Sequence, residues 1–138
     1  MQNAHQIRLE IPSEAEYVGV ARHAVECIAH KMCLDPNAVQ DVTLAVGEAC
    51  TNAMRHGTAS RRRPHVTIVC TMSPEQLQID ISNRLAGGEP CPCIVNNPDC
   101  SKEGGYGLYI MKKVMDEVSL IWGDRTATVR MIKRVKPL

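Results

Sequence analysis

Apolar and polar residues alternate at the start of the chain. Apolar side chains occupy alternate positions within residues 5–11, and Pro12 follows. This pattern predicts an edge strand that ends at the proline. Ser13 and Glu16 then have the spacing of a capping box, so a helix is expected from Ser13 to about Met32. The apolar side of that helix carries Val18, Ala21, Val25, Ile28 and Ala29.

A second helix is predicted from Asp35 to about Gly57. Asp35 suits its N-cap, and Pro36 suits the first turn, where a missing N–H costs no hydrogen bond. Its apolar stripe is assigned to Val39, Val42, Val46, Ala49, Cys50 and Ala53. The opposite side is assigned to Asp41, Ala45, Glu48, Asn52, Arg55 and His56.

The second half of the chain is predicted to contain two hairpins and a third helix. Alternating apolar residues predict a first hairpin of strands 65–71 and 76–82, joined around Ser73-Pro74. The same pattern predicts a second hairpin of strands Val118–Trp122 and Thr126–Arg134, joined around Gly123-Asp124. Residues 84–105 are irregular, and residues 107–117 are expected to be helical. A loop as long as 84–105 inside a compact domain is usually a functional lid or a disordered segment.

The order of these elements favours one fold class. They follow as β-α-α-β-β-loop-α-β-β, and 138 residues suit a single domain over 1–138. Strands gathered into hairpins, with helices to cover one face, indicate the α+β class. We expect a two-layer α/β sandwich with a mixed, mostly antiparallel sheet and helices on one face.

Charge and hydropathy exclude several functional classes. The net charge is +1, so the whole chain has no electrostatic attraction to nucleic acid or to a membrane surface. The dense basic run Arg61-Arg62-Arg63 precedes Pro64 and is predicted to be a solvated loop. No apolar run approaches the roughly 18 residues of a membrane span. The N-terminus also lacks the basic-then-apolar pattern of an export signal.

The cysteine content indicates a reducing compartment. The chain has 7 cysteines, and an odd number does not form a closed disulfide framework. Those in periodic segments are predicted to be small buried hydrophobic residues: Cys27, Cys33, Cys50 and Cys70. Cys91, Cys93 and Cys100 lie in the long loop and are either reduced thiols or a metal or redox cluster that orders the loop. Their spacing matches no common zinc motif, and a cytoplasmic location fits all of them.

Candidate chemistry begins on the second predicted helix. Glu48 and Asn52 are one turn apart, so their side chains point the same way. An asparagine carbonyl suits Mg²⁺, which usually takes few protein ligands. A glutamate one turn earlier can orient a water or accept a hydroxyl proton during phosphoryl transfer. Taken alone, such a pair is more often part of a solvated helix face, because Glu-x-x-x-Asn is a common spacing.

A second candidate segment opens the third predicted helix, at Gly104-Gly105-Tyr106-Gly107-Leu108. Glycines let the backbone approach a ligand closely, and free N–H groups at a helix start favour anions. The alternative is a flexible loop that enters a helix. The long preceding segment favours phosphate binding, because it could close over a ligand.

In this order, the residues resemble the bacterial anti-sigma-factor serine kinases, within the GHKL superfamily of ATPases. The resemblance is closest at residues 46–53, which match the N box, and at residues 103–111, which match the second Gly box. It continues at residues 115–118 and covers nearly the whole chain. It implies a Bergerat-type ATP-binding fold with an ATP lid at about 85–105.

The resemblance also implies roles for the matching residues. Asn52 would bind the Mg²⁺ that bridges the ATP phosphates, and Glu48 would be the general base toward a substrate serine. The phosphates would meet backbone amides at Gly105, Tyr106, Gly107 and Leu108. The partners would be a sigma factor and a STAS-type anti-anti-sigma protein that carries the serine. Such kinases usually act as homodimers, and Arg22 on the first helix would be a candidate partner contact.

The first Gly box departs from the family pattern. The family has Asp-x-Gly-x-Gly after the central strand, whereas this chain has Asn83 for the Asp that binds adenine and Leu85 for the first Gly. Asp80 is no clear substitute, and Ala127 stands where the family has a Thr near the nucleotide. We expect Asn83 to contact the nucleotide and ATP binding to be retained. The alternative is an adaptor of the same fold that binds partners without nucleotide.

Overall fold

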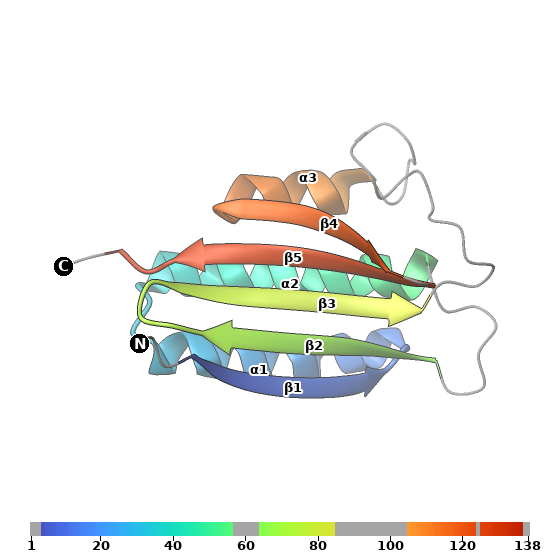
Figure 1. Ribbon diagram of the computed structural model, residues 1–138, viewed down its shortest axis with the longest axis horizontal. Helices are drawn as coiled ribbons and strands as arrows, with labels where there is room; N and C mark the ends of the chain where they lie inside the picture. Colours follow the sequence, from blue (N-terminus) through green and yellow to red (C-terminus); the bar gives the residue numbers. More distant parts are fainter. Residues whose placement is uncertain (1–3, 57–63, 85–104, 124, 137–138) are drawn as a thin grey trace.

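The computed structural model describes residues 4–56, 64–84, 105–123 and 125–136. These residues form five strands, three α-helices and one short 3-10 helix, in the predicted order (Figure 1). The strands are β1 (His5–Pro12), β2 (His65–Met72), β3 (Gln76–Arg84), β4 (Glu117–Gly123) and β5 (Thr126–Arg134). The helices are η1 (Ala15–Tyr17), α1 (Val18–Lys31), α2 (Pro36–His56) and α3 (Gly105–Val114).

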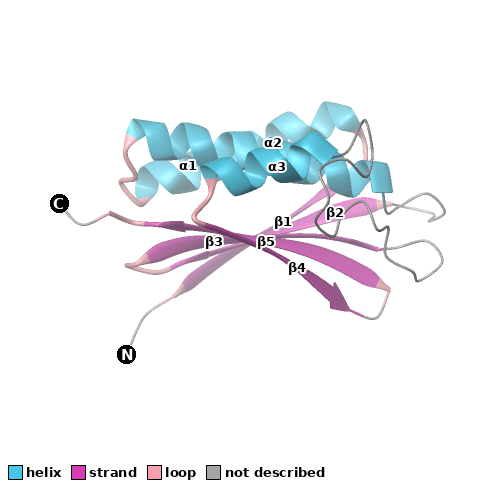
Figure 2. Ribbon diagram, turned by 90° about the horizontal axis from the view of Figure 1, so that it is seen from above, coloured by secondary structure: helices cyan, strands magenta, loops and turns pink. Residues whose placement is uncertain are grey.

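The strands form one sheet in the order β1-β2-β3-β5-β4. Every described pairing is antiparallel, so the described sheet has none of the parallel pairing that a mixed sheet would contain. Figure 2 shows the helices together on one face of the sheet, with the other face uncovered. The predicted α+β class and two-layer sandwich are therefore confirmed. None of the described helices is long and apolar enough to cross a membrane.

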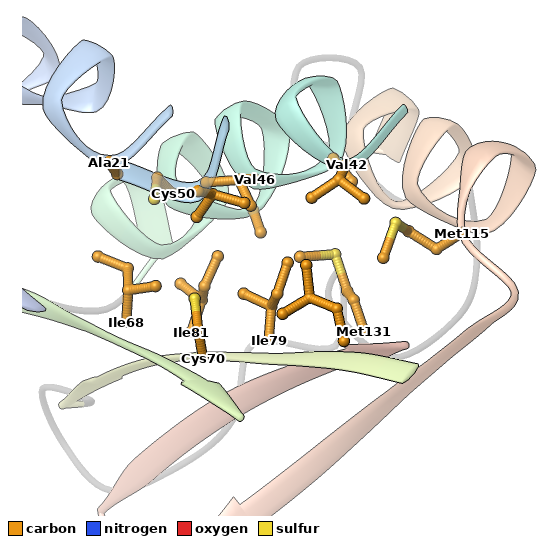
Figure 3. Close-up of a cluster of buried hydrophobic side chains, with 14 of the residues drawn as sticks. Ala21, Val42, Val46, Cys50, Ile68, Cys70, Ile79, Ile81, Met115 and Met131 are labelled. Carbon is orange, nitrogen blue, oxygen red and sulfur yellow. The ribbon is translucent and has the colours of Figure 1, made fainter. Parts of the chain in front are cut away.

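The core lies between the two layers because the strands alternate strictly. In β3, Leu77, Ile79 and Ile81 are buried toward the helices, whereas the residues between them face outward and are only partly covered. Figure 3 shows Val42 and Val46 of α2 on the helix side of the core, above Ile79 and Ile81 of β3. Burying an apolar side chain of this size stabilises the fold by about 1.5–3 kcal/mol. This contact between α2 and β3 holds the helix that carries the candidate chemistry.

Helix α2 is the central helix of the layer, and it packs against both α1 and α3. Its predicted N-cap is confirmed, because Asp35 Oδ1 accepts the N–H of Ala38 at 2.9 Å. The prediction that Ala45 lies on the opposite side from the apolar stripe is wrong, because Ala45 is fully buried. Glu48 and Asn52 are half-buried. The helix has neighbours on more than one side, so its buried surface is wider than the stripe.

Three predicted helix boundaries are wrong. The capping box at Ser13 does not start α1: the N–H of Ser13 donates to the carbonyl of Pro64 at 3.0 Å. The chain then makes the η1 turn, and α1 begins only at Val18. Helix α3 begins at Gly105, before its predicted start at residue 107, and ends at Val114, before its predicted end at residue 117, where β4 already begins.

The cysteine predictions are confirmed in part. Cys50 and Cys70 are buried, and burial raises the pKa of each thiol to about 12. Both therefore stay protonated and unreactive at neutral pH. Cys27 and Cys33 are exposed, so the prediction that they are buried is wrong. Other predicted features lie outside the described residues: the stop at Gly57, Arg61-Arg62-Arg63, the lid at 85–104, and Cys91, Cys93 and Cys100.

Candidate functional site

The two predicted segments meet where α3 begins beside α2. A Cβ added to Gly107 would lie 2.9 Å from Asn52 Nδ2 and 3.1 Å from Asn52 Oδ1. The same Cβ would lie 3.2 Å from Glu48 Oε1. The backbone of the second Gly segment therefore lies directly against the acid and amide of α2. We call Glu48, Asn52 and Gly107 the phosphate half of the site.

Apolar packing fixes the start of α3 in this place. Leu108, Met111 and Met115 recur at helical spacing and are buried against α2 and the sheet. Tyr106 and Tyr109 lie on the other side of the helix and are 67% and 51% exposed. The amide N–H groups at the start of α3 have no carbonyl one turn earlier within the helix, so this end favours an anion.

A buried lysine holds the other end of α3, and the sequence did not predict it. Lys133 of β5 faces the helices and is 8% exposed. Its Nζ donates to the carbonyl of Val114, the last residue of α3, at 2.6 Å, and to Asp41 Oδ2 of α2 at 3.1 Å. A cation at a helix C-terminus is stabilised by the helix dipole. Lys133 thus ties α3 to α2 and β5. The sequence did contain a signal for this burial, because Lys133 falls in the alternating row of β5 that faces the helices.

A second group of residues lies at the end of the sheet. Asn83 is 7% exposed and points toward the helix layer, in the same row as Ile81. It stands opposite Ala127 of β5, and Ala127 stands opposite Trp122 of β4. These three residues line a cavity of about 20 Å³ with Ile81 and Asn52, which also belongs to the phosphate half. We call Asn83, Trp122 and Ala127 the base half of the site.

The opposite face of β3 explains why Asp80 does not belong to the site. Asp80 Oδ1 accepts a hydrogen bond from Arg130 Nε at 2.8 Å on the uncovered face of the sheet. This bond raises the pKa of Arg130. The expectation that Asp80 is no substitute for the missing Asp is therefore correct, because a strand residue three positions before Asn83 points away from the helices.

A sequence profile of the histidine kinase-like ATPase domain matches residues 11–133. This range includes both halves of the site. The chain belongs to the histidine kinase-like ATPase family. The resemblance that the N box and the second Gly box indicated is thus confirmed.

Relatives within this family cover nearly the whole chain. Serine-protein kinase RsbW of Bacillus licheniformis is 33% identical over 139 residues, covering 94% of this chain and 86% of the relative. Serine-protein kinase RsbW of Bacillus subtilis is 29% identical over 143 residues, covering 95% and 86%.

Solved structures agree with the fold of this ATPase domain. The RsbU and RsbW domains of Rv1364c from Mycobacterium tuberculosis superpose with a TM-score of 0.71 at 13% identity, covering 96% of this chain and 33% of that one. The histidine kinase domain of a blue-light activated kinase from Erythrobacter litoralis gives a TM-score of 0.57 at 20% identity, covering 91% and 62%.

The fold of this family member thus brings together most of the predicted site residues. Glu48, Asn52 and Gly107 are in contact, and Asn83 shares a cavity with Asn52. Tyr106 presents an exposed side chain, whereas the side chain of Leu108 is buried. Gly105 begins α3, and Leu85 lies outside the described residues. Trp122 was not predicted as a site residue, although a tryptophan on the last hairpin was a visible signal.

Arg22 of α1 contacts α2 on the side of the helix that faces α1. The side chain of Arg22 lies across α2 at Gly47, where a Cβ would come 3.2 Å from its Cδ. Arg22 is exposed, and it lines a surface pocket with Thr43 and Leu44 of α2. It is therefore accessible to a partner.

Proposed function

We propose that the protein is an anti-sigma factor with ATP-dependent serine kinase activity. The observation that carries this proposal is the contact of Gly107 with both Glu48 and Asn52. It joins a glycine-rich helix start, which suits phosphates, to an acid and an amide that suit proton transfer and a hard cation. Relatives that cover most of the chain are named serine-protein kinases, which supports the same reaction.

Each residue of the phosphate half has a role in the proposed transfer. Asn52 offers its amide oxygen to Mg²⁺, which when bound neutralises charge on the phosphates of ATP. The backbone amides from Gly105 to Leu108 hold the phosphate oxygens. Glu48 accepts the proton of the substrate serine hydroxyl. As this proton leaves, the serine oxygen bonds to the γ-phosphorus of ATP, and the bond between the γ-phosphorus and the β-phosphate oxygen breaks. ADP and a phosphoserine are the products.

The proposed partners are a sigma factor and a STAS-type anti-anti-sigma protein that carries the serine. The name RsbW of the relatives and the exposed position of Arg22 on α1 support this assignment. We also propose that the protein works as a homodimer in the cytoplasm, as the family resemblance implies.

Phosphate transfer to a STAS-domain protein from the same genome tests this function. The purified protein is incubated with radiolabelled ATP, Mg²⁺ and that substrate. We expect labelling of a serine that is lost in Asn52→Ala and kept in Thr51→Ala, an exposed neighbour on the same helix. Wild-type protein that binds the partner but transfers no phosphate at saturating ATP would contradict the proposal.

One observation favours a second candidate, an adaptor that binds its partners without nucleotide. The base half carries Asn83 in place of the acidic residue of the family, and its cavity is only about 20 Å³. Partner affinity separates the two functions. A kinase-linked switch changes its affinity for the sigma factor when ATP replaces ADP, whereas an adaptor keeps the same affinity with and without nucleotide.

A further inference from the structure

The cavity of the base half begins at the phosphate half. Asn52 lines it on one side, and most of its wall is apolar, from Ala53, Ile81, Leu120, Trp122, Ala127 and Val129. A nucleotide whose phosphates lie at Gly107 and Asn52 would therefore direct its base into this cavity. Apolar walls with a few polar groups are typical of sites that bind the ring of a small molecule.

Asn83 is the side chain of this cavity that is placed to recognise the base. Besides Asn52, the polar residues among the described lining are Asn83 and Thr128. The Thr128 hydroxyl is 2.8 Å from the hydroxyl of Ser82, so it is already engaged. The Asn83 Nδ2 donates to the carbonyl of Arg84 at 3.4 Å, a long bond for an N–H donor. Rotating this amide therefore sacrifices little hydrogen-bond energy.

An amide offers a donor and an acceptor, whereas a carboxylate only accepts. Adenine presents an amino donor at C6 beside a ring-nitrogen acceptor, and an amide pairs with both. A 6-oxopurine presents an oxygen acceptor at C6 beside an N1–H donor, and the same amide pairs with both after rotating by half a turn. A carboxylate at this position would repel the oxygen at C6.

We infer that the site binds adenine and 6-oxopurine nucleoside triphosphates with similar affinity, and that Asn83 sets this relaxed selectivity. The inference rests on the proposed nucleotide-dependent function and specifies its substrate class. It concerns the atom at C6 of the base. ATP and inosine triphosphate are therefore suitable probes, because their bases differ at C6 and in the proton at N1.

Trp122 provides the readout. It is the only tryptophan of the chain, and it lines the same cavity. A cavity of about 20 Å³ has room for little more than one water, so an entering base must displace Trp122 or a residue next to it. Either movement changes the surroundings of the indole ring and therefore the fluorescence of Trp122. Titrations of the full chain with each nucleotide and Mg²⁺, by fluorescence and by calorimetry, give both dissociation constants.

We expect the wild-type constants for ATP and inosine triphosphate to agree within about threefold. Asn83→Asp, measured at about pH 8 to keep the new carboxyl ionised, should raise the preference for ATP by at least about tenfold. Gln78→Glu is the matched control, since it makes the same amide-to-acid change on the uncovered face of β3. It should leave the ratio unchanged.

Two results would overturn the inference, and they have different meanings. A wild-type preference for ATP above about tenfold, or an unchanged ratio in a folded Asn83→Asp variant, would refute it and leave the kinase proposal intact. No response to either nucleotide, with partner binding preserved, would refute the kinase proposal as well. If Asn83→Asp does not fold, as judged by thermal melting, the wild-type ratio alone decides.

Discussion

The phosphate half and the base half of the site are built differently. In the phosphate half, the backbone of one helix lies against side chains of another, at distances that leave no room for a methyl group on Gly107. In the base half, the wall is the end of a sheet with a small residue, Ala127, and a tryptophan that is 37% exposed. The first is a close contact between two helices that tolerates little displacement, and the second has a small cavity and a partly exposed wall.

This difference explains where the chain departs from its family. The N box and second Gly box are intact, whereas Asn83 and Ala127 replace the family residues of the base half. Phosphate transfer needs the same atoms in the same places for any nucleoside triphosphate. Base recognition needs only a complementary donor and acceptor, which different side chains supply. A substitution in the base half is therefore expected to change the nucleotide selectivity of the site rather than to abolish phosphate transfer.

The largest effect is expected for Glu48→Gln, which tests whether the phosphate half carries the chemistry. The amide keeps the size of the side chain beside Gly107 but cannot accept the serine proton. Loss of a general base typically lowers kcat by about 10²–10⁴-fold. Single-turnover phosphate transfer measures the rate, and calorimetry should show nearly unchanged ATP binding. A rate close to wild type would exclude Glu48 as the base.

Gly107→Ala is expected to have the next largest effect. The new methyl group would lie 2.9 Å from Asn52 Nδ2, so either α3 or the Asn52 side chain must move. Displacing catalytic groups by about 1 Å can cost about 100-fold in rate, and we expect at least that loss in kcat/KM.

Gly19→Ala on α1 is the matched control for this change. A Cβ at Gly19 meets no atom within 4 Å, so the alanine should stabilise the helix by about 0.5–1 kcal/mol and leave activity unchanged. Thermal melting of both variants separates a local clash from unfolding. Equal activity of the two variants would mean that the contact at Gly107 is not needed.

The contact at Gly107 also shows what could be predicted from the sequence. Alternation located the strands, and the matching boxes named Glu48, Asn52 and Gly107 before any contact was known. Both signals are local, and the contacts between residues far apart in sequence were less visible. The start of α1 was wrong because the N–H of Ser13 bonds to Pro64, a residue on a distant segment.

Other errors have the same origin. Ala45 was assigned to the wrong side because helical periodicity shows one apolar stripe, whereas α2 has a helix on each side as well as the sheet beneath it. Lys133 was missed because lysine is rarely buried without a partner, and its partners lie on α2 and at the end of α3. The tertiary position of a charged residue depends on such partners, which no local pattern reveals.

Lys133→Met tests whether the close contact in the phosphate half depends on its distant anchor. The substitution keeps a long apolar side chain but leaves the carbonyl of Val114 and the carboxylate of Asp41 without the ammonium. Removing one partner of a buried hydrogen bond costs about 1–3 kcal/mol. Urea unfolding should show this loss, and ATP affinity should fall as the start of α3 loosens.

Arg134→Met is the matched control for the anchor. Arg134 is the next residue of β5, and its guanidinium pairs with Glu117 where both side chains are exposed. Exposed pairs of this kind contribute at most about 1 kcal/mol, so this variant should unfold near the wild-type urea concentration. If Lys133→Met behaves like Arg134→Met in both stability and ATP affinity, Lys133 is not an anchor of the site.

The smallest effect is expected for Ala127→Ser, the counterpart in the base half of the change at Gly107. Each substitution adds one heavy atom to a buried position of the site. A base that enters the cavity of about 20 Å³ already displaces Trp122 or a neighbour, so the added hydroxyl at residue 127 needs only a slightly larger shift of the same wall. Residue 127 stands opposite Asn83, whose amide can accept or donate a hydrogen bond. ATP affinity, measured through Trp122 fluorescence, should therefore change by less than about threefold. A loss comparable to that of Gly107→Ala would show that the base half is as tightly constrained as the phosphate half, and the contrast between the two halves would then not hold.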